Sequence, residues 1–366
     1  MKSQSENRGE QKMAMKKETI TSERMTAETM SSALTAENLR MKYKSFLLDI
    51  PELRIPKGFV TALIGENGAG KTTLLRILAG VVLNYHGKIS YFDERISMDD
   101  TNVRSRIGYT APGSYFLPNW TGENVRDISP TLYPGFDVSR FDEFIREMAM
   151  EGYHNKVVDM SDGNRMKLEL ASVLARNTDL LLLDEPASPL DPLMREKLCD
   201  LLRAYIADGC GEKTVLLSSH NVADMESTTD YCIFMAQGRI VEQGFVEDLK
   251  EKYVLLTGPA VCMEKLRDMF VSCTGGTNEY TALAERAKLT EIRSAAATTA
   301  AMMVSYLSPE SEAASQNQVP SPEPPFEGTE SAGSVKNIQA DDAIVAERPT
   351  LQQISVGILR KYSKIS

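Results

Sequence analysis

The sequence contains few cysteines, and none of them belongs to a closely spaced pair. Five cysteines occur in 366 residues, an odd number spread over positions 199, 210, 232, 262 and 273. A disulfide framework needs an even set of paired cysteines, and a zinc site needs short Cys-x-x-Cys spacings. Neither is therefore expected, and the pattern favours a reduced compartment such as the cytosol.

Long apolar runs are also missing. A transmembrane helix needs about 20 consecutive, mostly apolar residues. The longest weakly apolar stretch, residues 294–307, is shorter than this and rich in Ala and Thr. The charged N-terminal residues are not followed by an apolar run, so we do not expect them to form a signal peptide.

The chain has no surplus of basic residues. Its 41 Lys and Arg stand against 51 Asp and Glu, which gives a formal net charge of −10. Because nucleic-acid-binding domains usually present a basic patch, a direct nucleic-acid partner is not expected. The hydrophobic fraction of 42% is ordinary for a globular protein with a buried core.

What the sequence does contain is an alternation of short apolar runs and helical patterns between residues 58 and 244. This alternation is typical of an α/β fold with a mostly parallel sheet. Residues 59–64 and 180–183 are continuous apolar runs, as expected for strands that are covered on both faces. Residues 232–242, with Gln-Gly at their centre, are expected to form a β-hairpin.

Shifts in composition divide the rest of the chain. Residues 308–340 are rich in Pro, Ser and Glu, which is typical of a disordered linker, and the segment after them regains apolar residues that are expected to fold back onto the preceding stretch. The predicted parts are a flexible N-terminal extension (1–34), a main domain (35–252), a C-terminal accessory region (253–307), the linker (308–340) and a C-terminal segment (341–366).

Residues 65–72, Gly-Glu-Asn-Gly-Ala-Gly-Lys-Thr, match the phosphate-binding pattern G-x-x-x-x-G-K-[ST] at every fixed position. They follow an apolar strand and open a helical pattern, which is the context that such a loop requires. Glycines let successive N–H groups turn toward phosphate oxygens, and the helix N-terminus adds its positive dipole end. Lys71 is expected to contact the β- and γ-phosphates of ATP, and the Thr72 hydroxyl to bind Mg²⁺. The predicted nucleotide-binding residues of this loop are Gly65, Asn67, Gly68, Gly70, Lys71, Thr72 and Thr73.

A pair of acids follows the apolar run at residues 180–183. An acid at the carboxyl end of a strand lies at the mouth of a parallel sheet, beside the phosphate-binding loop. Asp184 is therefore expected to hold Mg²⁺ through water. Glu185 is a candidate general base for the water that attacks the γ-phosphate.

The order of four further motifs resembles that of the ABC ATPases. Residues 160–164, Met-Ser-Asp-Gly-Asn, are similar to the family's signature, usually LSGGQ, and lie one helix upstream of the acidic strand. Residues 188–191, Ser-Pro-Leu-Asp, are similar to its D-loop. His220 ends the next apolar strand, where the family keeps its switch histidine, and Tyr43 stands where an aromatic residue stacks on adenine.

The resemblance implies the P-loop ABC ATPase fold: a mostly parallel core sheet, a small antiparallel β part, a helical subdomain inserted at about 113–166, and here a C-terminal extension. It also implies that ATP is held between two such domains, a homodimer or a pair of paralogues, with Ser161 and Gly163 of one closing over ATP on the other. His220 would contact the γ-phosphate and position Glu185. The helical subdomain would dock onto a separate membrane permease at the cytoplasmic face of the cell membrane, where the chain is bound peripherally.

Two positions depart from the family pattern. The signature carries Asp162 and Asn164 in place of a small or basic residue and Gln, and the added carboxylate would lie near the triphosphate of a facing subunit. Arg165 or Lys167 would relieve this repulsion locally, or a paralogue with an intact signature would be the partner. Pro112 occupies the place of the family's Q-loop glutamine.

Other functions of ABC ATPases fit less well. Those that act on ribosomes carry two motif sets in one chain, and those that repair DNA separate their motifs by a long coiled coil, whereas this chain has one compact set. A weakly hydrolysing regulatory half of a heterodimer is the alternative that Asp162 and Pro112 leave open. Residues 132–150 and 347–361 are similar to a bacterial subgroup that pairs with permeases of the type-2 exporter class, which favours transport.

Overall fold

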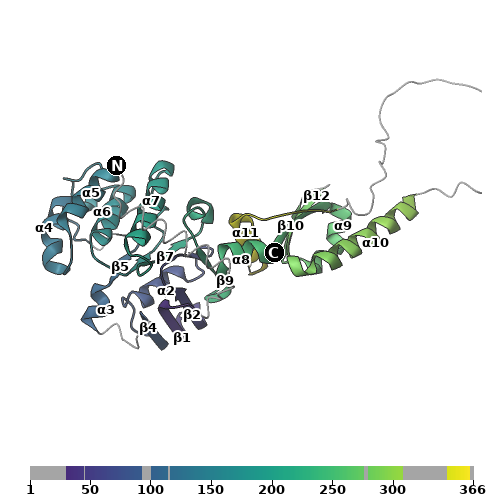
Figure 1. Ribbon diagram of the computed structural model, residues 1–366, viewed down its shortest axis with the longest axis horizontal. Coiled ribbons are helices and arrows are strands. Elements are labelled where there is room, and N and C mark those ends of the chain that lie inside the picture. Colours follow the sequence, from purple (N-terminus) through teal and green to yellow (C-terminus); the bar gives the residue numbers. More distant parts are fainter. Residues whose placement is uncertain are drawn as a thin grey trace, which may run out of the picture. The chain divides into compact units, whose positions relative to one another are not determined.

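The computed structural model describes residues 30–44, 46–92, 100–113, 116–275, 279–307 and 344–362. The chain forms two compact units (Figure 1). The first consists of Met1–Lys250 and Thr350–Ser366, and the second of Glu251–Pro349. The segments expected to be a flexible extension and a disordered linker lie almost entirely outside the described residues.

A six-stranded sheet forms the centre of the first unit, with the order β5-β6-β7-β3-β8-β9. The first five strands in this order are parallel, and β9 pairs antiparallel with β8. The mostly parallel α/β core predicted from the apolar runs is confirmed. The strands are β3 (Val60–Ile64), β5 (Ile107–Thr110), β6 (Leu180–Leu183), β7 (Thr214–Ser219), β8 (Tyr231–Ala236) and β9 (Arg239–Phe245).

The predicted hairpin is present as β8 and β9. Gln237 and Gly238 connect the two strands, and both have positive φ, 50° and 78°. Two successive left-handed residues form a type I′ turn, whose twist matches that of the flanking antiparallel strands.

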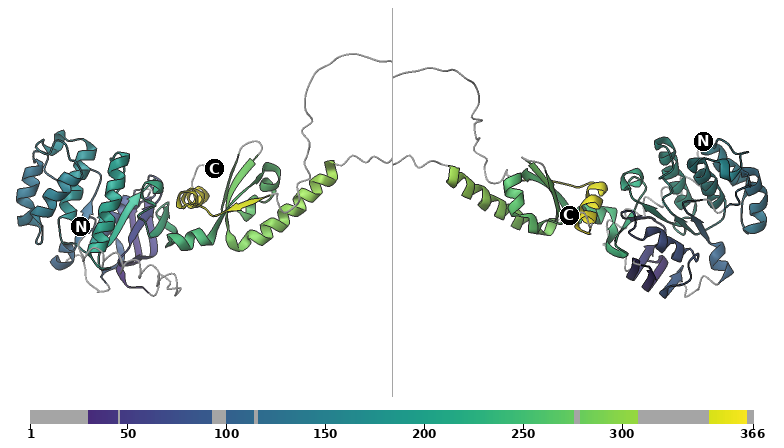
Figure 2. Two further views of the ribbon diagram at one scale, coloured as in Figure 1. Left: turned by 45° about the horizontal axis from the view of Figure 1, so that its top comes forward. Right: turned by 180° about the vertical axis from the view of Figure 1, so that it is seen from behind.

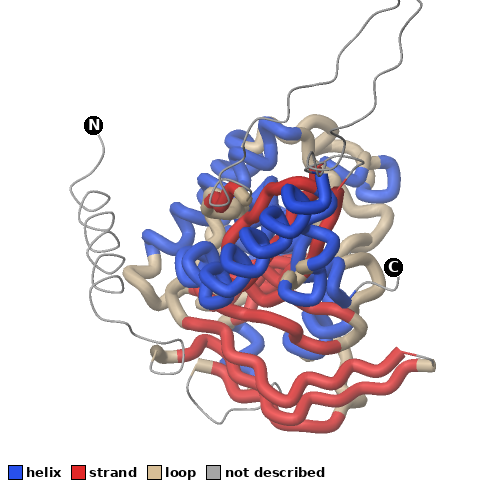
Figure 3. Tube along the Cα trace, turned by 90° about the vertical axis from the view of Figure 1, so that its right-hand side faces the viewer, coloured by secondary structure: helices blue, strands red, loops and turns tan. Residues whose placement is uncertain are grey.

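A small antiparallel sheet of order β2-β1-β4 packs beside this core, at the lower edge of the unit in Figures 1 and 3. Its strands are β1 (Ser32–Tyr43), β2 (Phe46–Pro56) and β4 (His86–Tyr91). The predicted flexible extension over residues 1–34 is therefore wrong at its end. Residues 32–34 belong to β1, because Ala33 and Leu34 are fully buried in the core.

Several helices of the first unit begin where polar side chains cap their free N–H groups, whereas α2 follows Gly70 and has no side-chain cap. Thr121 and Asn124 form a capping box at α4, Asp137 caps α5, Ser161 caps α6 and Asp191 caps α7. Helices α4 and α5 lie between β5 and β6 in the sequence, as the expected helical insertion requires. No helix in the described part of the chain is both long and apolar enough to cross a bilayer. The helices are α2 (Lys71–Leu78), α3 (Thr101–Ser105), α4 (Gly122–Leu132), α5 (Val138–Glu147), α6 (Asp162–Leu174), α7 (Pro192–Asp208) and α8 (Val246–Lys252).

The position of the functional site follows from the strand order. Strands β6, β7 and β3 are adjacent and parallel, so their carboxyl ends meet at one edge of the sheet. The loop at residues 65–70 follows β3, the acid pair follows β6, and His220 follows β7. Three motifs that are far apart in the sequence are therefore neighbours in space.

The second unit has an antiparallel sheet and a core of its own. The sheet order is β11-β12-β10-β13, and α10 runs beside it (Figure 2). Apolar side chains of β10 and β12, such as Leu256 and Ala282, pack with Ile292 of α10. The elements are β10 (Tyr253–Pro259), α9 (Ala260–Lys265), β11 (Ser272–Gly275), β12 (Glu279–Glu285), α10 (Leu289–Leu307) and β13 (Val345–Glu347).

The C-terminal segment divides between the two units. Strand β13 pairs with β10, so this part folds back onto the accessory region as expected. Helix α11 (Leu351–Tyr362) belongs instead to the first unit, where it packs against β8 and the short helix η2 (Val222–Met225). The Glu226 carboxylate accepts a hydrogen bond from Leu351 N at 3.2 Å, and Gln237 Nε2 donates to Tyr362 O at 2.8 Å. One face of α11 is buried, at Leu351, Ile354, Ser355, Gly357 and Ile358.

Replacing a buried side chain of α11 should therefore destabilise the first unit. Ile354 is fully buried, so we expect Ile354→Ala to lower the free energy of unfolding by about 2–5 kcal/mol. Val356, which is 42% exposed on the same helix, is the matched control, and Val356→Ala should change stability by less than about 0.5 kcal/mol. Urea unfolding of the full chain measures both, and equal effects would show that α11 is not packed as described.

Candidate nucleotide-binding site

The phosphate-binding loop connects β3 to α2, and its backbone requires glycine at several positions. Gly68 and Gly70 have φ of 84° and 106°, a region that side-chain-bearing residues rarely adopt. A Cβ on Gly65 would lie 2.4 Å from the carbonyl oxygen of Met235. Helix α2 begins directly after the loop at Lys71, so its free N–H groups and positive dipole end face the loop.

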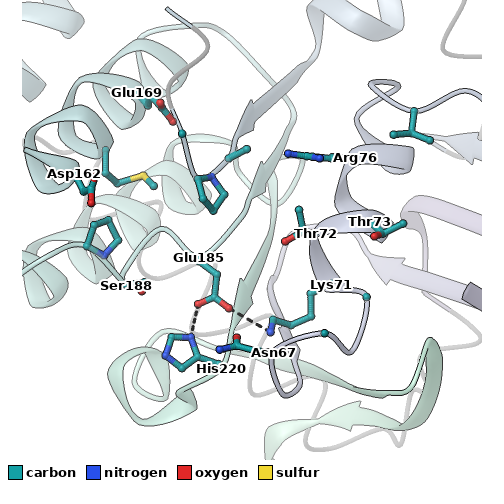
Figure 4. A pocket seen from close by; sticks show the side chains of 18 of the residues that line it. Asn67, Lys71, Thr72, Thr73, Arg76, Asp162, Glu169, Glu185, Ser188 and His220 are labelled. Carbon is teal, nitrogen blue, oxygen red and sulfur yellow. Dashed lines mark hydrogen bonds and ion pairs between the residues drawn. The ribbon is translucent and has the colours of Figure 1, made fainter. Parts of the chain in front are cut away.

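Lys71 lies inside the curve of its own loop. Its side chain is only 5% exposed, and Nζ donates to Gly65 O at 2.8 Å and to Glu66 O at 3.3 Å. The same ammonium lies 3.3 Å from Glu185 Oε1 (Figure 4). The Lys71 ammonium therefore joins the phosphate-binding loop to the acid pair, although Lys71 and Asp184 are 113 residues apart in the sequence.

Asp184 is fully buried behind the loop. Its Oδ1 accepts a hydrogen bond from Ser218 Oγ at 2.6 Å, and the same Oγ accepts from Glu185 N at 2.9 Å. Asp184 Oδ2 has no hydrogen-bond partner among the described residues. A buried carboxylate oxygen without a donor among the described residues suits a hard divalent cation such as Mg²⁺, and the Thr72 hydroxyl, which lines the cavity, offers a second oxygen ligand.

Glu185 contacts His220 as well as Lys71. His220 Nδ1 lies 2.7 Å from Glu185 Oε2, so Lys71, Glu185 and His220 form one row of contacts (Figure 4). Glu185 has a φ of 50°, a conformation that costs a residue with a side chain on the order of 1 kcal/mol. The turn after β6 holds this conformation and directs the carboxylate toward His220.

A cavity of about 1,250 Å³ opens in front of this row. Tyr43, 59% exposed, lines it together with Met41 and Phe46 of the antiparallel sheet. Gly65 and Asp184, also predicted, are not among the lining residues. The predicted residues that line the cavity are Tyr43, Asn67, Gly68, Gly70, Lys71, Thr72, Thr73, Glu185 and His220.

The signature segment lies at the start of α6. Ser161 is the N-cap, and its Oγ accepts a hydrogen bond from Asn164 N at 3.2 Å. A Cβ on Gly163 would lie 3.0 Å from Pro189 O, so glycine fits there closely. Neither Ser161 nor Gly163 lines the cavity of its own chain, but Asp162 does, and its carboxylate forms an ion pair with Arg165.

The cavity wall at Pro112 differs from the motif pattern of the ABC ATPases. Pro112 lines the cavity and offers no side-chain amide. Arg76 and Glu169, which sequence reasoning missed, line it too. Arg76 follows Thr72 by four residues on α2, and this helical spacing is the signal that would have found it. Burial, and next to it the Asp184 charge, raises the pKa of Tyr109, so its phenol stays neutral behind this wall.

Comparison with known proteins gives a consistent result. A family model described as ABC transporter matches residues 48–188. The phosphate import ATP-binding protein PstB 2 of Aliivibrio fischeri is 32% identical over 237 residues, covering 58% of this chain and 84% of that protein. The lantibiotic transport ATP-binding protein SrtF of Streptococcus pyogenes is 29% identical over 226 residues, covering 60% of this chain and 95% of that protein.

Solved structures share the fold. An ATP-binding subunit of an ABC transporter aligns with a TM-score of 0.52 and 23% identity, covering 60% of this chain and 92% of that chain. A dimeric bacterial ABC transporter cassette aligns with a TM-score of 0.50 and 21% identity, covering 58% of this chain and 98% of that chain. These likenesses confirm the α/β fold expected from the motif order.

Ser218 should stabilise the acid pair, because its hydroxyl bonds to both residues. We expect Ser218→Ala to lower the free energy of unfolding by about 1–3 kcal/mol, since it leaves the buried Asp184 carboxylate without a donor. Thr61 on neighbouring β3 is the control. Its buried hydroxyl has no hydrogen-bond partner in the described part of the chain, so Thr61→Val should be close to neutral. If both variants unfold at the same urea concentration as the parent, the Ser218 contact contributes nothing.

Proposed function

The chain belongs to the ATP-binding proteins of ABC transporters, ATP-hydrolysing motor subunits that work with membrane permeases, and on this premise we propose which of its residues do the work. Lys71 and Thr72 bind the phosphates of ATP, Asp184 binds the metal, and Glu185 and His220 carry the chemistry. One observation carries the proposal. Glu185, which follows β6, contacts both Lys71, at the end of the loop after β3, and His220, which follows β7.

Binding begins at the phosphate loop. The N–H groups around Gly68 and Gly70 and the N-terminus of α2 face the cavity and suit phosphate oxygens. Lys71, held against Glu185 without nucleotide, exchanges part of this contact for the β- and γ-phosphates. Tyr43 is exposed at the same cavity, where its ring is available to stack on adenine. Asn67 and Thr73 complete the rim.

Thr72 and Asp184 would hold Mg²⁺. Both offer hard oxygen ligands, and Asp184 Oδ2 is buried without a donor among the described residues. The metal, when bound, would neutralise the charge that develops on the phosphate oxygens during transfer. Ser218 fixes the other carboxylate oxygen, so Asp184 is held in one orientation.

Glu185 is the general base. Its carboxylate lies at the cavity and accepts a proton of the attacking water. As the bond from the water oxygen to the γ-phosphorus forms, the bond from that phosphorus to the β–γ bridging oxygen breaks, and ADP leaves with inorganic phosphate as the other product. His220 contacts Glu185 Oε2 and orients the carboxylate, and it is 48% exposed, so it can also reach the γ-phosphate. The row of contacts between Lys71, Glu185 and His220 favours an active subunit. The alternative, a weakly hydrolysing regulatory half, is supported only by Pro112 at the Q-loop position.

The partners are a permease and a second ATP-binding subunit, which we propose to be a second copy of this chain. Ser161 and Gly163 would then close over ATP held by the other copy. The ion pair between Asp162 and Arg165 supports a homodimer, because it compensates the carboxylate within the same chain. The subunit would act peripherally at the cytoplasmic face of the cell membrane. The relatives include a phosphate import subunit and a lantibiotic transport subunit, so the proposal concerns the motor and not its cargo.

Two substitutions should separate ATP binding from hydrolysis. Lys71→Ala removes the phosphate-binding cation and should abolish binding of ATP and turnover, whereas Glu185→Gln should keep binding and slow hydrolysis by about 10²-fold or more. Lys213, another buried lysine paired with Asp208, is the control, and Lys213→Ala should still bind ATP. Fluorescent-nucleotide titration and phosphate release measure the two steps. Parental turnover in either site variant would refute the assignment.

The Asp162–Arg165 pair should set the strength of ATP-driven dimerisation. In a Glu185→Gln background, Asp162→Gly should tighten the dimer and Arg165→Ala should weaken it, each by about 10-fold, since one like-charge contact costs about 1–3 kcal/mol. Arg203 pairs with Asp200 in the same i, i+3 spacing on α7, so Arg203→Ala is the control. Sedimentation against ATP concentration gives the dimerisation constant. Unchanged constants in both variants would mean that the pair does not face the second nucleotide.

A further inference from the structure

Two loops carry the residues that we assign to hydrolysis. The first is the turn over residues 184–191, which holds Glu185 and leads into α7. The second runs from His220 through η2. They touch at the site itself through the contact of Glu185 with His220. A second connection lies farther from the cavity, at Arg195 on α7.

Arg195 bonds to both loops through one guanidinium group. Its Nε donates to Leu190 O at 2.9 Å and to Ala187 O at 3.1 Å, both carbonyl oxygens of the first turn. Its Nη1 donates to Asp224 Oδ2 at 2.9 Å, in η2 of the second loop. A planar guanidinium with donors in fixed directions can join two elements in this way, whereas an ammonium is a single point charge.

Asp224 also links Arg195 to the residue that follows His220. Its Oδ2 also accepts from Asn221 Nδ2 at 3.0 Å, and Asn221 directly follows His220. Ser219 Oγ donates to Asn221 O at 2.7 Å, on the other side of the histidine. Asn221, the residue after His220, is therefore linked through Asp224 to Arg195, and Ser219, the residue before His220, bonds to Asn221.

Partial burial strengthens the ion pair between Arg195 and Asp224. The side chains of Arg195 and Asp224 are 28% and 24% exposed, so the pair is less screened by solvent than the ion pairs on the outer surface. Charge-assisted hydrogen bonds of this kind are roughly twice as strong as neutral ones. The turn that Arg195 holds also includes Ser188 and Pro189, which line the cavity.

We propose that Arg195 is a positioning residue for ATP hydrolysis, which keeps the Glu185 turn and the His220 loop in register so that the two side chains meet. The inference rests on the proposed roles of Glu185 and His220. Arg195 is not among the described residues that line the cavity, so its loss should affect the chemical step and leave binding of ATP intact. A displacement of about 1 Å between a base and its partner is enough to slow a reaction by up to about 10²-fold.

The test compares Arg195→Met with Arg203→Met. Arg203 lies on the same helix and also bonds to a residue after η2, to Ser227 O at 3.1 Å, but it connects to no part of the Glu185 turn through any contact that the structure describes. We expect Arg195→Met to lower kcat for ATP by about 10- to 100-fold with KM changed less than about twofold. Arg203→Met should keep the parental kcat. Arg195→Lys should recover only part of the rate.

A double-mutant cycle with Asp224→Asn separates positioning from stability. If the two residues act through one contact, their effects on kcat should be strongly non-additive. A kcat that stays parental in Arg195→Met, even with a lower melting temperature, would overturn the proposal, and so would a parallel loss of ATP affinity. Failure of the proposed function itself looks different, because Glu185→Gln would then hydrolyse ATP at the parental rate whatever Arg195 does.

Discussion

The adjacency of three parallel strand ends is the constraint on which the site depends. Strands β6, β7 and β3 pair side by side, so the residues that follow them must emerge at the same edge of the sheet. One row of contacts joins residues that follow these strand ends: Lys71 after β3 and its loop, Glu185 after β6 and His220 after β7. The buried apolar strands fix the register, since a slip by one residue would turn every side chain to the opposite face.

Charge compensation is the second theme of the site. The cavity carries Lys71, Arg76 and Arg165 together with Asp162, Glu169 and Glu185. Lys71 is paired with Glu185 and Arg165 with Asp162, so these four charges are compensated locally. In the function we propose, ATP at the phosphate loop would draw Lys71 away from Glu185 and so would couple binding to the availability of the proposed base.

The loops around this row are held from behind by polar side chains. Ser218 bonds to both acids, and Arg195 joins the turn after β6 to the loop after β7. Helix α11 adds a further contact by packing on η2, so the end of the chain supports the segment that follows His220. None of these supporting side chains is among the described residues that line the cavity.

The sequence by itself determined the α/β class, the phosphate loop, the acid pair and the hairpin at Gln237-Gly238, because each depends on local periodicity or on the backbone needs of a few consecutive residues. It did not reveal Ser218, Arg76 or Arg195, because a serine in an apolar strand and an arginine in a helix look ordinary until the neighbouring strand or loop is placed. The start of β1 at Ser32 was missed for the same reason, since only pairing with β2 buries that end. The helical spacing allowed a local partner for Asp162 to be expected, and the structure selected Arg165 over Lys167. Only the tertiary structure decided that α11 leaves the accessory unit, because its buried face packs on β8 and η2, and sequence order does not encode which partner comes within a few ångströms.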